Sequence, residues 1–252
     1  RQCLQEYAAL ILRHDVQRIV AVTTSAARDV TNADELFKIG SELNIPIQIF
    51  SGDQEAEFTF KGAFMGTPQS QEPKMVIDIG GGSTEFIFGD QFSKTDQIEN
   101  KISLDIGAVR LTEMFVTRHP ISCEEQRIAE KHVRNELKKI VTMKKSGVRY
   151  HSVAVAGTPT TLAAVVQGVV FSPEKIDGYF LSHGVLVSWE KGLSDMTVEQ
   201  RQNLIGMEPK RADVLPMGIL ILRLACEVLG FEGFHVSTKG LRYGIAAQAV
   251  AQ

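Results

Sequence analysis

The segment Asp78-Ile-Gly-Gly-Gly-Ser-Thr-Glu85 constrains the fold more than any other part of the chain. An apolar run at residues 74–79 precedes its three glycines, and a second apolar run at residues 84–88 follows them. Each run is typical of a buried strand, so the segment predicts a β-hairpin with the glycines in its turn. Consecutive glycines lose much backbone entropy on folding, and a two-residue hairpin turn does not require them. We therefore expect the glycine triplet to have a functional role.

The turn itself is suited to binding a phosphate group. Glycine adopts positive φ readily, so successive N–H groups can point into one concavity that accepts phosphate oxygens. The glycines expected to do so are Gly80, Gly81 and Gly82, and Ser83 adds a hydroxyl donor. The alternative is a turn whose glycines are purely structural.

Two carboxylates flank this turn. Asp78 ends the first strand and Glu85 begins the second, so the hairpin would bring both to the same cradle. Mg²⁺ takes oxygen ligands and usually keeps several waters when it is bound beside phosphate. We expect Asp78 and Glu85 to hold Mg²⁺ there, and the alternative is that both carboxylates are solvated.

The rest of the chain predicts an α/β protein. Apolar strands at residues 18–22 and 45–50 alternate with helical patterns at residues 4–12 and 32–43. After residue 74 the order changes to an antiparallel meander, with a third strand near residues 98–104, followed by helices. This change suggests two α/β lobes joined near residues 52–73, and a cleft between such lobes is a common ligand site.

Composition excludes several other classes of protein. The chain of 252 residues has a formal net charge of -3, so nothing global indicates a nucleic-acid partner. No apolar run approaches the roughly 18 residues of a membrane helix, and we expect no membrane association. The three cysteines show no metal or disulfide spacing, which fits the reducing cytoplasm.

Six segments, in order, resemble the motifs of the Ppx/GppA phosphatase family, which comprises exopolyphosphatases and guanosine pentaphosphate phosphohydrolases. They span most of the chain: Thr24–Asp29, Ser51–Ala56, Asp78–Glu85, Ala156–Leu162, Arg211–Gly218 and Ser237–Arg242.

The resemblance implies the two-lobe fold of the actin-like ATPase superfamily, with the phosphate chain bound between the lobes. Lobe I would comprise residues 1–57, with the C-terminal helix at residues 241–252 packing back on it, and lobe II residues 58–240. The implied activity is Mg²⁺-dependent hydrolysis of terminal phosphoanhydride bonds of polyphosphate, guanosine pentaphosphate or both. A homodimer is common among such proteins.

The resemblance also assigns a general base, Glu55, which precedes Ala56 in the Ser-Gly segment. Without the family, Glu55 would be an ordinary first-turn helix carboxylate, favoured by the helix dipole. Arg28 follows a strand and could clamp phosphate, or could pair with a neighbouring acid. Lys210 and Arg211 precede a long helix, where a cation gains nothing from the dipole. This favours a phosphate-binding role for one of them, and we assign it to Arg211.

A further site is expected at Gly157 and Thr158, where a strand runs into a helix with Thr158 as its N-cap and Pro159 at its first position. Such a position faces anions or nucleotides, although a plain helix cap would look the same.

The chain departs from the family pattern in four places, one of which is Glu57, where a basic residue often follows Ala. No Asp-x-Gly-Ser-like first phosphate hairpin is present, so we expect lobe I to be incomplete. Gln54 replaces a typical Glu, and Thr238-Lys239 replaces an acidic-basic pair. Two other functions stay open, a non-catalytic polyphosphate or guanosine-polyphosphate binding protein and an actin-like ATPase or sugar kinase. The Ser51–Ala56 segment argues against the kinase.

Overall fold

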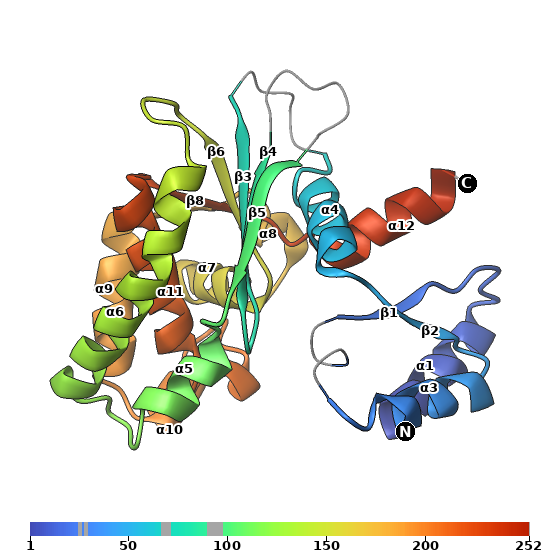
Figure 1. Ribbon diagram of the computed structural model, residues 1–252. Helices are drawn as coiled ribbons and strands as arrows, with labels where there is room; N and C mark the ends of the chain where they lie inside the picture. Colours follow the sequence, from blue (N-terminus) through green and yellow to red (C-terminus); the bar gives the residue numbers. More distant parts are fainter. Residues whose placement is uncertain (25–26, 28–29, 67–71, 90–97, 252) are drawn as a thin grey trace.

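The computed structural model of the protein describes residues 1–24, 27, 30–66, 72–89 and 98–251 (Figure 1). Their helices and strands, in chain order, are α1 (Gln2–Arg13), β1 (Ala21–Thr23), α3 (Ala33–Glu42), β2 (Ile47–Ile49), α4 (Gly52–Ala63), β3 (Lys74–Ile79), β4 (Thr84–Gly89), β5 (Ile98–Leu104), α5 (Ala108–Phe115), α6 (Cys123–Leu137), η1 (Lys138–Met143), β6 (His151–Val155), α7 (Gly157–Gln167), α8 (Pro173–Ile176), β7 (Phe180–Ser182), α9 (His183–Ser194), α10 (Val198–Gln202), η2 (Pro209–Arg211), α11 (Leu215–Leu229), β8 (Gly233–Val236) and α12 (Leu241–Ala251). In this part of the chain, no helix has the length and apolar character needed to cross a bilayer.

The larger sheet has six strands in the order β5-β4-β3-β6-β8-β7. Strands β3, β4 and β5 form an antiparallel meander, while β3 pairs with β6, and β6 with β8, in parallel. The meander expected after residue 74 is therefore confirmed. The glycine turn joins two strands in the interior of the sheet.

One face of this sheet packs against most of the helices. Met75, Ile77 and Ile79 alternate along β3 and belong to a core that also contains buried residues of α5, α6, α7, α9 and α11. Helix α11 is apolar on nearly every side and lies inside this layer, as Figure 1 shows. This large core fixes the strands from which the glycine turn projects.

The opposite face of the sheet packs against α4. Val76 and Ile87 contact a second, smaller core that includes Phe60 of α4. Helix α12 lies alongside α4 (Figure 1), and two glycines allow the close approach. A methyl group on Gly62 would lie 2.1 Å from the Gly240 carbonyl oxygen, and one on Gly244 would lie 2.0 Å from that of Phe58.

The smaller sheet contains only β1 and β2, which pair in parallel. Helices α1 and α3 lie beside these strands, separate from the large sheet (Figure 1). Nη1 of Arg18 donates a hydrogen bond of 2.8 Å to the Ala249 carbonyl, which joins this part to α12. The lobe boundary proposed between residues 57 and 58 falls inside α4.

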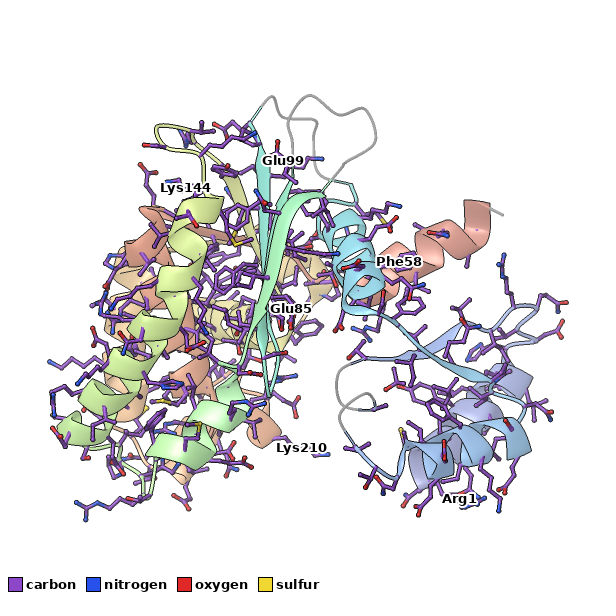
Figure 2. All side chains as sticks on the ribbon, in the orientation of Figure 1. Arg1, Phe58, Glu85, Glu99, Lys144 and Lys210 are labelled. Atoms are coloured by element: carbon purple, nitrogen blue, oxygen red, sulfur yellow. The ribbon has the colours of Figure 1, made fainter. Side chains whose placement is uncertain are left out.

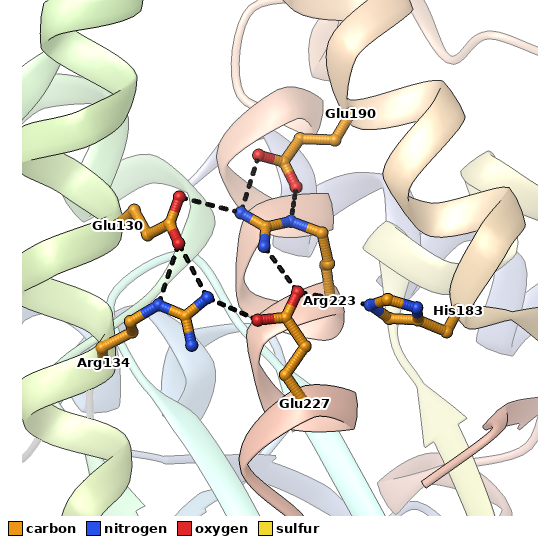
Figure 3. Close-up of polar contacts among 6 residues, drawn as sticks. All are labelled: Glu130, Arg134, His183, Glu190, Arg223 and Glu227. Carbon is orange, nitrogen blue, oxygen red and sulfur yellow. Dashed lines mark hydrogen bonds and ion pairs between the residues drawn. The ribbon is translucent and has the colours of Figure 1, made fainter. Parts of the chain in front are cut away.

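A network of ion pairs cross-links three helices of the large core (Figure 3). Arg223 of α11 donates to Glu190 of α9 at 2.5 Å and to Glu227 of its own helix at 2.7 Å. It also contacts Glu130 of α6 at 3.2 Å, and Arg134 bonds both Glu130 and Glu227. These bonds fix the spacing of α6, α9 and α11 behind the sheet.

Candidate active site

The glycine segment forms the expected hairpin. Ile79 pairs with Thr84 as the last pair of β3 and β4, and the Gly80 N–H donates to the Ser83 carbonyl at 2.9 Å. The Gly80 N–H is therefore engaged within the turn. The N–H groups that follow Gly80 in the turn would therefore be the ones to contact phosphate.

The expectation that the triplet adopts positive φ is wrong, since none of its three glycines has this conformation. The turn instead rests against the start of α5. The N–H groups of Ala108 and Arg110 donate to the carbonyls of Gly80 and Gly81 at 3.0 and 2.9 Å. A methyl group on Gly107 would lie 2.3 Å from the Gly81 carbonyl oxygen, so close backbone contact is one physical reason for small residues here.

Asp78 and Glu85 stand directly opposite each other on neighbouring strands. Figure 2 shows Glu85 on β4, and its Oε1 accepts hydrogen bonds from the hydroxyls of Ser83 and Ser103, each at 2.7 Å. Burial, and then the charges of Glu85 and Glu55, raise the pKa of Asp78 to about 7. The hairpin therefore brings both predicted metal ligands together, as expected from its register.

Glu55 lies in the first turn of α4, whose start is fixed by a capping box. The Ser51 hydroxyl accepts from the Gln54 N–H at 3.2 Å, and the Gln54 side chain accepts from the Ser51 N–H at 3.0 Å. Gln54, one of the departures from the family pattern, thus completes the cap. The cap positions Glu55 at the sheet face that carries Glu85.

A cavity of about 220 Å³ lies between the start of α4 and strands β4 and β5. Its lining includes the predicted base Glu55 and the predicted metal ligand Glu85, together with Asp53, Lys101 and Ser103. Neither Lys101 nor Ser103 belongs to a motif of the sequence. The strand pattern of residues 98–104 places both on one face of β5, but only the pairing of β5 with β4 and the packing of α4 bring that face to the cavity.

Mg²⁺ fits this arrangement only if other ligands complete its shell. In the parts of the chain that the structure describes, no group of three or more His, Cys, Asp or Glu side chains could hold a metal ion. However, Asp78 pairs with Glu85 across the two strands, and Glu85 shares a cavity with Glu55; burial first, and then the charges of Glu85 and Glu55, raise the pKa of Asp78. Mg²⁺ is commonly held by one or two carboxylates plus substrate phosphates, and Asp78 and Glu85 suit that role.

A second cavity, of about 630 Å³, lies at the start of α7. Gly157 and Arg211 both line it, together with Thr160, Thr238 and Arg242. The Arg211 guanidinium lies so close to Gly157 that a methyl group there would be 1.9 Å from Cζ. Two of the residues expected to face phosphate or nucleotide are thus brought together at a helix N-terminus.

Thr158 does not lie on this cavity, contrary to expectation. Its side chain is 2% exposed and packs against Gly218 of α11. Helix α7 begins earlier than the Thr158-Pro159 pair suggests, since Gly157 is its first residue and Ala156 its N-cap, with φ of 72°. The α7 hydroxyl residues that line the cavity are Thr160 and Thr161, two and three positions after Thr158. Arg28 lies outside the described residues.

Comparison with known proteins identifies the family. The model of the Ppx/GppA phosphatase family matches residues 1–252, so the chain belongs to this family. It is 32% identical to exopolyphosphatase 2 of Mycobacterium tuberculosis, over 98% of this chain and 79% of that protein. It is 34% identical to a bifunctional 3-dehydroquinate synthase/phosphatase of Fusobacterium nucleatum, over 99% of this chain but only 38% of that protein.

Solved structures agree with this assignment. A crystal structure of the Aquifex aeolicus Ppx/GppA family member matches with a TM-score of 0.83 and 31% identity, over 99% of this chain and 79% of that one. An exopolyphosphatase from Cytophaga hutchinsonii matches with a TM-score of 0.86 and 27% identity, over 99% and 80%. The expected fold class is therefore confirmed.

Proposed function

We propose that this protein hydrolyses terminal phosphoanhydride bonds of inorganic polyphosphate, guanosine pentaphosphate or both. Membership of a phosphatase family and similarity to exopolyphosphatases support a phosphatase acting on polyphosphate. The observation that carries the proposal is the meeting of Glu55 and Glu85 at one cavity, with Asp78 beside them. A base and a cation-binding pair in one place are what hydrolysis of a polyanion requires.

In this proposal Glu55 acts as general base. Its carboxylate accepts a proton from a water molecule whose oxygen attacks the terminal phosphorus. The bond to the bridging oxygen breaks, and that oxygen stays with the shortened chain as orthophosphate leaves. Mg²⁺, when bound by Asp78 and Glu85, would neutralise charge on the transferred group.

Other residues would hold the substrate. The hairpin N–H groups and Ser83 would bind phosphate oxygens. Arg211 of η2, whose guanidinium lies beside the start of α7, would bind a phosphate further along the polyphosphate chain or the phosphates of a nucleotide. The 630 Å³ cavity is within the range of about 300–1,000 Å³ that accepts organic ligands, which supports a nucleotide as one substrate.

Phosphate release tests the proposal directly. The protein would be incubated with polyphosphate, guanosine pentaphosphate or ATP, each with and without Mg²⁺, while equilibrium binding is measured in parallel. We expect phosphate release from polyphosphate or guanosine pentaphosphate. This release should depend on Mg²⁺ and should be faster than release from ATP. Binding without release would instead indicate a non-catalytic binding protein, and preference for ATP would indicate an ATPase.

A further inference from the structure

In the described part of the chain, the cavity beside Glu55 is lined by one basic side chain, Lys101, which belongs to none of the sequence motifs. Among the residues that line it, the acids are Asp53, Glu55 and Glu85, and the basic residue is Lys101. A substrate phosphate that enters this cavity meets several carboxylates. A positive side chain in the same place is therefore relevant to binding.

The sheet places Lys101 on the face that α4 covers. Ser103 pairs with Glu85 in the β4–β5 register, and Lys101, two residues earlier, pairs with Ile87. Side chains two residues apart on a strand point to the same side. Lys101 therefore lies on the same face of the sheet as Ser103 and Glu85. The lysine thus projects from β5 towards the start of α4, where Asp53 and Glu55 lie.

In the structure, the Lys101 ammonium forms an ion pair with Oδ1 of Asp53. The Asp53 side chain is 81% exposed and that of Lys101 is 33% exposed. Ion pairs between exposed side chains contribute only about 0–1 kcal/mol, so exchanging this partner has a small energetic cost. A phosphate group carries more charge than one carboxylate and accepts several hydrogen bonds, so it can displace Asp53.

We propose that Lys101 is a substrate-binding residue, and that its ion pair with Asp53 is replaced when substrate binds. When a terminal phosphate enters beside Glu55, the ammonium leaves Asp53 and donates to a phosphate oxygen. Asp53 therefore competes with the substrate for the same cation. The proposal rests on the proposed phosphohydrolase function, and it assigns to β5 a contact with the phosphate that is removed.

A purely structural role makes a different prediction. If the Lys101–Asp53 pair only ties β5 to α4, then breaking it from either side should impair the enzyme in the same direction. If Lys101 binds substrate, the two substitutions should have opposite effects. Removing Asp53 frees the lysine, whereas removing Lys101 takes away the contact.

The experiment measures kcat/KM for a short polyphosphate in three variants. Lys101→Met should lower kcat/KM by roughly tenfold, the effect of losing one charge-assisted hydrogen bond. Asp53→Asn should raise it by roughly two- to fivefold. In the double variant, Asp53→Asn should give no gain, because the cation it frees is absent.

Lys145→Met is the matched control. Lys145 forms an ion pair of 2.6 Å with Glu99, which is on β5 like Lys101. Neither Lys145 nor Glu99 lines the cavity. This variant should keep the parental kcat/KM. Decreases in both single variants would establish the structural role, and an equal gain from Asp53→Asn with and without Lys101 would show only general charge repulsion. Either result overturns the proposal, whereas a parent that releases no phosphate refutes the proposed function instead.

Discussion

Asp78 and Glu85 face each other as a direct pair across β3 and β4, with Glu55 close enough to add its charge. Burial and this repulsion raise the pKa of Asp78 from 3.8 to about 7. A carboxyl with a raised pKa favours the folded state when protonated and opposes it when ionised. The stability that depends on its protonation is complete below pH 3.8 and is lost as the pH rises through about 7.

Asp78→Asn should therefore stabilise the protein at neutral and alkaline pH. The variant carries a neutral side chain of similar shape, so its advantage should grow between pH 4 and pH 7 and then level off at a few kcal/mol at most. Urea unfolding without Mg²⁺, followed at several pH values, checks this. An advantage that is the same at every pH would show that ionisation of Asp78 is not responsible.

Gly157→Ala should weaken substrate binding without unfolding the protein. The new methyl group would lie 1.9 Å from Cζ of Arg211, and the flexible end of that side chain would move away. KM should rise about as much as in Arg211→Ala, and combining the two substitutions should add little. Gly184→Ala, in the first turn of α9 with open space around it, is the control and should leave KM unchanged.

Arg223→Met should strongly destabilise the large core. Glu190 is only 7% exposed, and Arg223 is its ion-pair partner among the described residues (Figure 3). A buried carboxylate left without its partner costs about 3–5 kcal/mol, whereas replacing both partners by apolar residues can be nearly neutral. The double variant Arg223→Met/Glu190→Leu should accordingly recover most of the loss in urea unfolding.

The control for this pair is Arg127→Ala, since Arg127 and Glu124 form an exposed pair on α6. Its free energy of unfolding should change by less than about 1 kcal/mol. If Arg223→Met behaves like this control, the network does not stabilise the helices.

Sequence patterns predicted the parts of the fold that local rules determine. The two apolar runs around the glycines predicted β3 and β4, and a third strand predicted near residues 98–104 matches β5, all close to their observed bounds. Short elements such as β7 and α8 carry too few residues for a periodic pattern, and their places depend on contacts with distant segments.

In the candidate site, too, local sequence patterns predicted some features, while others depend on contacts between distant segments. The hairpin pattern was enough to predict that Asp78 and Glu85 meet. The start of α7 was misplaced because Thr158-Pro159 looks like a cap, while the fold begins the helix at Gly157, beneath Arg211. Lys101 was missed because its position beside Glu55 depends on pairing between β4 and β5 and on the packing of α4 against them.

Replacing Glu55 by Gln tests the central claim most directly. Gln keeps the shape and hydrogen bonding of Glu but cannot accept the proton of the attacking water. We predict that Glu55→Gln binds polyphosphate at least as tightly as the parent, because a charge beside the polyanion is removed. Its rate of phosphate release should fall by about 10²- to 10⁴-fold. Release at the parental rate, from polyphosphate or from guanosine pentaphosphate, would contradict the assignment of Glu55 as the base.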